Sequence, residues 1–237
     1  MININVSCLP RSGSTFIQKV FSDAACMKKL KFIGPGNKPD FVSADSVVCP
    51  TRFYYTKQQI KNNKNLNFLI QLRDPRDVLV SQYYYFYNCV VQNEMKKKSQ
   101  EMVRSNSIDY YVLSDIGVDD LLERSKNLEY THNLDNVDII LYDKMVLDFR
   151  KWIDEAMKHL NLSNNNKNIL FNKFGKDFKN IKEINPENIT KKRIRITHKR
   201  KIIPGDYKQK LKSSTIKILN NKLSSILDII SKYQKFI

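Results

Sequence analysis

Short runs of apolar and β-branched residues alternate along the chain with longer stretches whose apolar residues recur at helical spacing. The short runs predict buried strands at residues 2–9, 46–53, 67–72 and 137–141. Helical spacing predicts one helix from Ser14 and another from Pro75, where proline suits the first turn. Further helices are expected at residues 117–130, 145–160, 164–178 and 208–233.

Strands that alternate with helices indicate an α/β fold, with a central, mostly parallel sheet flanked by helices. No internal repeat and no linker is visible, so one domain is predicted over residues 1–237. Ligands of such folds bind beyond the carboxyl ends of the strands. The polar residues 92–115 are interpreted as a lid or a substrate loop, and the basic residues 185–206 as a loop.

Composition favours a globular chain, because 41% of the residues are hydrophobic. No apolar run reaches the roughly 18–20 residues that span a bilayer, and no basic leader with an apolar stretch follows Met1. The four cysteines show no CxxC spacing, which argues against a disulfide framework or a structural zinc site: Cys8, Cys26, Cys49 and Cys89. These features predict a cytoplasmic protein without a metal centre.

The excess of basic over acidic residues narrows the classes of molecule that the protein is expected to bind. Lysine and arginine total 41 against 24 acidic residues, a formal charge of +17. Such a charge favours polyanions, although an AT-rich coding sequence also enriches lysine. The densest stripe, residues 191–201, alternates with isoleucine instead of tyrosine or phenylalanine. Nucleic acid is therefore not the expected partner, because single strands are bound through aromatic stacking.

The first chemical motif is Pro10-Arg11-Ser12-Gly13-Ser14-Thr15, between a strand and a helix. The first turn of a helix exposes N–H groups without intrahelical partners, and the helix dipole attracts an anion there. Gly13 permits close approach of the backbone, while Arg11 adds a cationic fork. The pattern GxxxxGK[ST] is absent, so the loop suits a phosphate-like group without the usual magnesium nucleotide.

The second motif, Arg73 to Ser81, follows the strand at 67–72. Arg73 stands at the carboxyl end of the strand and Ser81 two turns into the next helix, so both could bind a second phosphate. Alternatively, Arg73 and Arg76 pair with Asp74 and Asp77. The spacing alone leaves both interpretations open.

Together these motifs resemble those of sulfotransferases that use 3′-phosphoadenosine 5′-phosphosulfate (PAPS). Residues 10–16 (PRSGSTF) resemble the 5′-phosphosulfate loop of that family, and residues 72–86 (LRDPRDVLVSQYYYF) its 3′-phosphate motif. Residues 200–208 (RKIIPGDYK) resemble the late R-K-G-x-x-G-D-W-K element, and residues 141–145 a strand that ends in Y-E-D-M. The four stretches occur in the order of the family.

The resemblance implies roles residue by residue. Arg11, in the usual lysine position, would stabilise charge on the bridging oxygen as the S–O bond breaks. The remaining roles are binding of the 5′-phosphosulfate by Ser12, Gly13, Ser14 and Thr15, contact with adenine by Phe16 and Tyr142, and binding of the 3′-phosphate by Arg73, Ser81, Arg200 and Lys201. Phe174 or Phe178 would line the purine slot. Ile202 replaces a glycine and Tyr207 a tryptophan.

The general base does not transfer from the resemblance. The cytosolic branch of the family uses a histidine before the second motif, whereas the matching residues 47–54 contain none. Other branches use a carboxylate, which makes Asp40 and Asp45 the candidates. His198 is assigned to the basic stretch.

The resemblance thus implies an enzyme that transfers the sulfuryl group of PAPS to a hydroxyl or amine and releases adenosine 3′,5′-bisphosphate. The expected acceptor is a small molecule or a glycan, with sugars, phenols, lipids and peptides all left open. It would lie beside residues 53–55, 83–87 and 92–115, whose tyrosines are equally consistent with a core. The alternatives are another P-loop-like nucleotide enzyme, such as a small-molecule kinase, and a basic nucleic-acid-binding protein.

Overall fold

A computed structural model describes residues 2–34, 45–88, 94–179 and 203–234. The chain forms two compact units, each assembled from separate stretches of sequence. Unit 1 comprises residues 1–73, 124–180 and 228–237, and unit 2 comprises residues 74–123 and 181–227. The single domain expected over residues 1–237 stays a prediction.

Unit 1 contains a sheet of five parallel strands in the order β2-β3-β1-β4-β5. The strands are β1 (Asn3–Cys8), β2 (Lys31–Ile33), β3 (Ser46–Thr51), β4 (Asn67–Leu72) and β5 (Val137–Leu141). Every residue of β1 is buried, as expected for the central strand of a sheet covered on both faces. The predicted α/β class and parallel sheet are confirmed.

The strand order places a topological switch point between β1 and β4. From β1 the chain moves towards β3 and β2, and from β4 it moves in the other direction to β5. Cys8 is in register with Gln71, so the segments that follow these two strands leave the same edge of the sheet side by side. Open α/β sheets bind ligands at this position.

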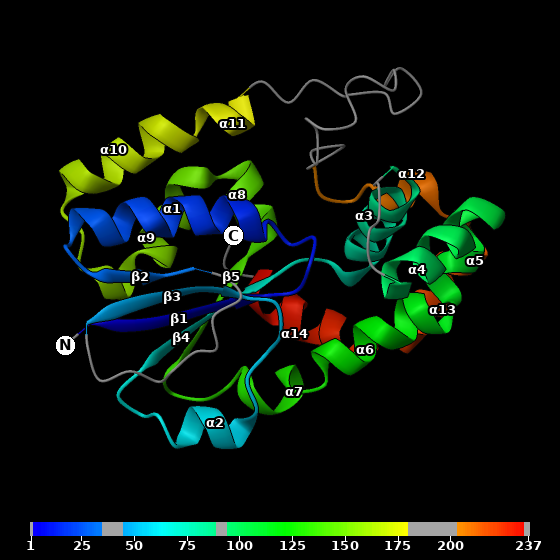
Figure 1. The fold of residues 1–237 in the computed structure, drawn as a ribbon, viewed down its shortest axis with the longest axis horizontal. Coiled ribbons are helices and arrows are strands. Elements are labelled where there is room, and N and C mark those ends of the chain that lie inside the picture. Colours follow the sequence, from blue (N-terminus) through cyan, green and yellow to red (C-terminus); the bar gives the residue numbers. More distant parts are fainter. Residues whose placement is uncertain (1, 35–44, 89–93, 180–202, 235–237) are drawn as a thin grey trace. The chain divides into compact units, whose positions relative to one another are not determined.

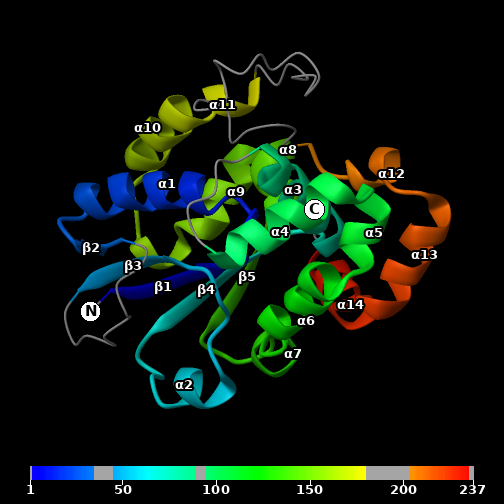
Figure 2. The same ribbon diagram turned by 45° about the vertical axis from the view of Figure 1, so that its right-hand side comes forward.

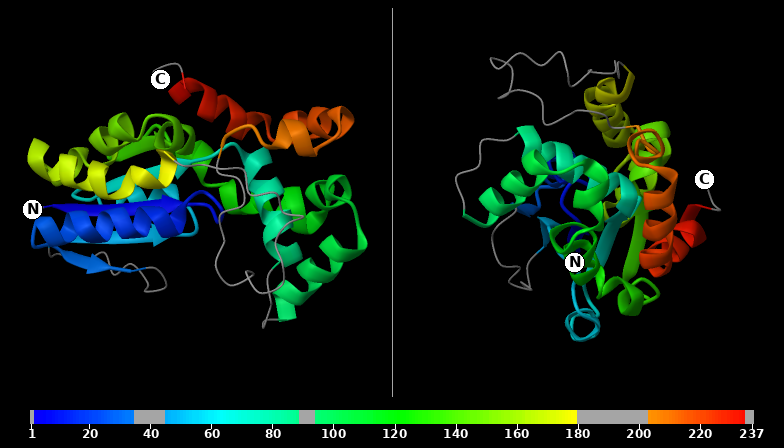
Figure 3. Two further views of the ribbon diagram at one scale, coloured as in Figure 1. Left: turned by 90° about the horizontal axis from the view of Figure 1, so that it is seen from above. Right: turned by 90° about the vertical axis from the view of Figure 1, so that its right-hand side faces the viewer.

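Helices cover both faces of the sheet in unit 1 (Figure 1). On one face lie α1 (Ser14–Met27), α8 (Tyr142–Leu147), α9 (Phe149–Ala156), η2 (Lys158–Leu160), α10 (Asn164–Phe174) and α11 (Lys176–Lys179). On the other face lie α2 (Lys57–Lys61) and α7 (Leu128–Thr131). The turned views agree that α10 runs beside α1 (Figures 2 and 3).

Unit 2 is helical in its described residues. It contains α3 (Pro75–Asn88), α4 (Glu94–Ser105), α5 (Ile108–Leu113), η1 (Asp115–Asp119), α12 (Tyr207–Lys210) and α13 (Ser213–Lys222). The chain passes between the units within α6 (Asp120–Ser125) and α14 (Ser224–Gln234). Within residues 92–115, interpreted as a lid or a substrate loop, α4 and α5 show that most of the segment is helical and not an irregular loop.

Two long helices predicted from the sequence are each divided into shorter helices in the structure. Residues 145–160 are interrupted at Asp148, which has φ −138° and caps α9 by accepting a hydrogen bond from the Lys151 N–H at 3.1 Å. Residues 208–233 are interrupted at Leu211, which is extended, and at Leu223. Apolar spacing continues across these breaks because each short helix buries the same face, so periodicity alone does not reveal them.

Candidate active site

The loop after β1 has the backbone of an anion-binding turn. Arg11 and Gly13 both adopt left-handed conformations, with φ of 70° and 84°, and the Ser12 N–H donates to the Leu9 carbonyl at 3.2 Å. Helix α1 begins at Ser14 with Gly13 as its N-cap and no side-chain cap. The N–H groups of Ser14 and Thr15 therefore lie in a first turn that has no earlier helical carbonyl to accept them.

Two side chains of β4 and its carboxyl end hold this loop. Gln71 Nε2 donates to the Ser12 carbonyl at 2.6 Å, and Arg73 Nη1 donates to the Arg11 carbonyl at 2.6 Å. All four residues belong to unit 1. The structure therefore brings Arg73 to the loop, as the second motif requires, and Arg73 does not pair with Asp74 or Asp77 through any contact recorded among the described residues.

Arg73 is only 7% exposed and has hydrogen-bonding capacity left over. Its guanidinium carbon lies 4.2 Å from the centre of the Tyr142 ring, a cation–π arrangement. Its Nε is buried and has no hydrogen-bond partner among the described residues. A buried, unsatisfied donor on a cation is costly unless an acceptor arrives, so this atom points to an anionic ligand.

Gly13 is required by both its conformation and its surroundings. A Cβ at this position would lie 2.9 Å from Met145 Cε and 3.4 Å from both Gln71 Nε2 and Tyr142 Cε2. We expect Gly13→Ala to lower the free energy of unfolding by about 0.5–1 kcal/mol more than Gly205→Ala, measured by chemical denaturation, because the terminal methyl group of Met145 must move. Gly205 is the matched control, because its φ of 86° is similar but nothing lies within 4 Å of its Cβ position. Equal losses would contradict a packing role for Gly13.

An aromatic cluster surrounds the first turn of α1. The Phe16 ring packs edge-on against Phe149, Phe174 and Phe178, with centroid distances of 5.5, 5.8 and 4.9 Å. Phe16 is half-buried and Tyr142 is 3% exposed. Phe16 thus meets both phenylalanines predicted beside the purine, whereas Tyr142 packs beneath Arg73 and near Gly13.

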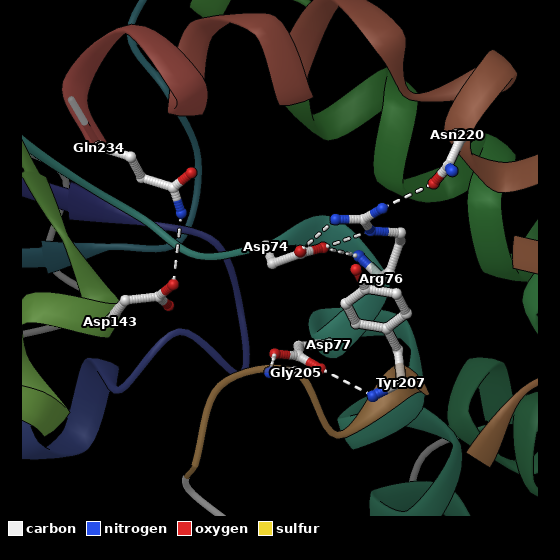
Figure 4. A network of polar contacts seen from close by, with 8 residues as sticks. All are labelled: Asp74, Arg76, Asp77, Asp143, Gly205, Tyr207, Asn220 and Gln234. Carbon is white, nitrogen blue, oxygen red and sulfur yellow. Dashed lines mark hydrogen bonds and ion pairs between the residues drawn. The ribbon is translucent and has the colours of Figure 1, made fainter. Parts of the chain in front are cut away.

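In unit 2, the start of α3 is bonded to the late motif (Figure 4). Asp77, which is 1% exposed, accepts hydrogen bonds from the Gly205 N–H at 2.7 Å and from the Tyr207 N–H at 3.0 Å. Arg76 pairs with Asp74 at 2.6 Å and stacks on the Tyr207 ring at 4.1 Å. The predicted Arg76–Asp74 pair is therefore present, and Asp77 holds the backbone of residues 205 and 207.

Replacement of Asp77 tests this connection. We expect Asp77→Asn to lower the free energy of unfolding by about 1–3 kcal/mol, because one buried N–H then faces an NH₂ group instead of an acceptor. The measurement is chemical denaturation, with Asp119→Asn as the control. Asp119 forms an exposed ion pair with Lys222 at 3.2 Å, so its loss should cost at most about 1 kcal/mol. Similar small effects of both variants would show that Asp77 is not a structural tie.

The other predicted site residues are less informative. Ser81 lies half-buried in α3 of unit 2. Arg200, Lys201 and Asp40 fall outside the described residues. Tyr55, predicted beside the acceptor, is 1% exposed and packs in a core cluster with Ile60, Leu66 and Phe68.

The structure does not bring Asp45 to the loop. Asp45 immediately precedes β3 and accepts a hydrogen bond from the Ile2 N–H at 2.5 Å, before β1 begins. In a parallel sheet that position is the amino edge, whereas residues 10–15 follow the carboxyl edge. The strands between are six residues long, or about 17–20 Å. This distance does not support Asp45 as the general base.

Neither a metal site nor a reactive thiol is supported by the described part of the chain. There, no group of three or more histidine, cysteine or acidic side chains is placed to hold a metal ion. Cys8 ends β1, but burial raises the pKa of its thiol to about 12, so it stays protonated at neutral pH. Among the described helices, none has the length and hydropathy needed to cross a bilayer.

Sequence reasoning missed two residues that hold the candidate site together. Gln71 is the one polar residue between Phe68 and Leu72 in an otherwise apolar strand, and this interruption was the available signal. Asp77 had a weaker signal, because an acidic residue in the first turn of a helix is common for electrostatic reasons alone. Its partners lie 128 and 130 residues away in the chain.

Comparison with known proteins extends over both units. No curated protein matches the chain in sequence. Among solved structures, mouse sulfotransferase SULT7A1 complexed with PAP has a TM-score of 0.62 at 14% identity, over 93% of this chain and 84% of that one. Retinol dehydratase, in complex with androsterone and inactive cofactor PAP, has a TM-score of 0.56 at 17% identity, over 96% of this chain and 80% of that one.

At such identities the two structures establish a shared fold. The family model described as "Sulfotransferase domain" goes further, because it matches residues 3–228 and so includes the loop after β1, the Arg73 motif and the Gly205 element. With these three elements in one match across nearly the whole sequence, the chain belongs to the sulfotransferase family.

Proposed function

We propose that the protein transfers the sulfuryl group of PAPS to a hydroxyl or amine of a small-molecule or glycan acceptor. The observation that carries this proposal is the 2.6 Å bond from Arg73 to the Arg11 carbonyl. It joins the cation at the end of β4 to the anion-binding loop after β1. Two anion-binding features at neighbouring strand ends suit a donor that carries phosphate groups on both the 3′ and the 5′ oxygen of its ribose.

The residues present fit such a donor. The first turn of α1 offers N–H groups at Ser14 and Thr15, next to the positively charged Arg11. Arg73 Nε is a buried donor without an acceptor among the described residues. In this proposal, the loop holds the 5′-phosphosulfate, Arg73 contacts the 3′-phosphate, and Phe16 contributes to the purine site.

In this proposal, the protein promotes the reaction mainly by electrostatic stabilisation of developing charge. The bound donor supplies a sulfuryl group on a bridging oxygen of its 5′-phosphate. As the acceptor oxygen or nitrogen bonds to sulfur and the S–O bond breaks, Arg11 and the loop N–H groups stabilise the negative charge that develops on that bridging oxygen. Gln71 and Arg73 hold the backbone of this loop before the reaction, through the Ser12 and Arg11 carbonyls, so little reorganisation of its N–H groups is needed.

The proton of the acceptor requires a base that the described residues do not identify. Asp40 remains the proposed carboxylate, and Asp40→Asn tests it through the pH dependence of transfer. Ser81, Arg200 and Lys201 likewise stay proposals as ligands of the 3′-phosphate. Each can be tested by its effect on the affinity for adenosine 3′,5′-bisphosphate.

Two experiments test the function itself. Saturating adenosine 3′,5′-bisphosphate should raise the melting temperature, since a ligand that binds only the folded state stabilises it. A screen with ³⁵S-labelled PAPS and mixed acceptors should yield a labelled product. An unchanged melting temperature would contradict the proposed function, whereas a magnesium-dependent preference for ATP would favour a kinase.

A further inference from the structure

The Gln71 side chain is wholly buried, and one of the three polar contacts recorded for it reaches the loop after β1. Nε2 donates to the Ser12 carbonyl at 2.6 Å and lies 3.7 Å from Met145 Sδ, while Oε1 accepts from Trp152 Nε1 at 3.0 Å. A buried amide in the middle of an apolar strand face is costly unless its hydrogen bonds are made. Here they join β4 to the loop and to α9.

The orientation of the amide is fixed by its partners. An indole N–H is only a donor and a backbone carbonyl is only an acceptor. The oxygen of Gln71 must therefore face Trp152, and its NH₂ group must face Ser12. A rotated amide would place two donors together on one side and two acceptors together on the other, so this hydrogen-bond arrangement has one favourable form.

This bond determines where the next amide points. The Ser12–Gly13 peptide is trans, and in a planar trans peptide the C=O and N–H groups point in opposite directions. When Gln71 holds the Ser12 carbonyl towards β4, the Gly13 N–H points away from β4. No acceptor for this N–H is recorded among the described residues.

A glycine at this position makes such control necessary. A peptide plane can rotate when the flanking residues tolerate both signs of φ, and glycine does so more readily than any other residue. Without Gln71, the Ser12–Gly13 peptide would be free to turn its carbonyl towards the anion site. A carbonyl there would repel the 5′-phosphate that the amide attracts.

We propose that Gln71 is a positioning residue that keeps the Gly13 N–H aimed at the 5′-phosphate of the donor. The inference rests on the proposed function for the identity of the ligand. The orientation of the amide does not depend on it. Arg73 acts similarly on the preceding carbonyl, but it also carries charge, whereas Gln71 acts through geometry alone.

Two nucleotide probes separate positioning from general damage. For Gln71→Leu, we expect the Kd of adenosine 3′,5′-bisphosphate to rise about 10- to 100-fold, the effect of losing a hydrogen bond to a charged group. The Kd of adenosine 3′-monophosphate, which lacks the 5′-phosphate, should change less than about twofold. Gln71→Met should behave like Gln71→Leu, because a thioether keeps the length of the side chain but cannot donate to Ser12.

Ile70→Val is the matched control, since Ile70 is a buried neighbour in β4 and its loss of one methyl group destabilises without touching the loop. Its ratio of the two Kd values should equal that of the wild type. Equal weakening of both nucleotides in Gln71→Leu, or no weakening of either, would overturn the proposal.

A measurement without ligand keeps the two proposals apart. The chain has six glycines, so ¹⁵N-glycine labelling gives a simple amide spectrum. In Gln71→Leu and Gln71→Met, the Gly13 signal should shift or split, while that of Gly205, bonded to Asp77, should stay unchanged. If the wild type fails to bind the bisphosphate but Gly13 responds, the proposed function fails and the positioning of Gly13 stands. An unchanged Gly13 signal overturns the positioning role.

Discussion

Arg11→Ala is expected to lower kcat for sulfuryl transfer by about 10²–10³, the usual effect of removing one donor to developing negative charge. Arg11 lies in the loop whose other groups, the N–H groups of Ser14 and Thr15, are backbone atoms and remain in the variant. The assay uses labelled PAPS and the acceptor with the largest signal in the mixed screen. The Kd of adenosine 3′,5′-bisphosphate should rise no more than about tenfold, because most of the loop is unchanged.

The backbone conformation makes this variant a clean test. Arg11 has φ 70°, and alanine carries the same Cβ strain, so the free energy of unfolding should change by less than about 1 kcal/mol. Arg11→Lys should recover kcat to within about tenfold, since it restores a cation where the family usually has lysine. Arg104→Ala, which removes an exposed charge from α4, is the control for net charge. A kcat of Arg11→Ala above half the wild-type value would refute the role of Arg11.

The main architecture follows from local pattern. Strands β4 and β5 begin and end where apolar runs do, and α1 begins at Ser14, directly after the glycine of the loop. The short edge strand β2 was missed, because three residues are too few to show a period. The sequence predicts a mostly parallel sheet but not the order of its strands. The pairing of β1 with β4 joins residues about sixty positions apart in the chain, and no local pattern indicates it.

The position of a candidate site residue could be predicted where chemistry and chain direction coincide. Arg73 follows a strand directly, so the carboxyl edge of a parallel sheet brings it to the loop after β1. Asp45 could have been excluded by the same reasoning, because it precedes a strand and therefore lies at the amino edge. Gln71 could not be assigned a role from sequence, because its partner Trp152 is 81 residues away and only packing brings them together.

Replacement of Arg73 should have a large effect on binding, because one guanidinium has two tasks. Its Nη1 holds the Arg11 carbonyl, and its buried Nε is left for a ligand. We expect Arg73→Leu to raise the Kd of adenosine 3′,5′-bisphosphate by about 100-fold or more, as the 3′-phosphate loses a charge-assisted bond and the loop loses a support. Unfolding should also become easier by about 1–3 kcal/mol, since the Arg11 carbonyl loses its donor.

The two tasks can be measured separately. The ratio of the Kd values for adenosine 3′,5′-bisphosphate and adenosine 5′-monophosphate reports on the 3′-phosphate, while denaturation reports on the support of the loop. Arg73→Lys should fully restore neither the binding of the 3′-phosphate nor the stability of the loop. An ammonium group on a flexible stem lacks the planar guanidinium that can donate to the phosphate and to the Arg11 carbonyl at the same time.

Arg150→Leu is the matched control for Arg73→Leu. Arg150 also stacks on an aromatic ring, with its guanidinium carbon 4.3 Å from the centre of Phe171, and also donates a hydrogen bond, to Asn168, but at the surface. Its loss should leave the Kd ratio unchanged. If Arg73→Leu weakens both nucleotides equally, Arg73 only supports the loop, and another residue must bind the 3′-phosphate. A 3′-specific loss together with easier unfolding would show that the same side chain shapes one anion site and forms part of the second.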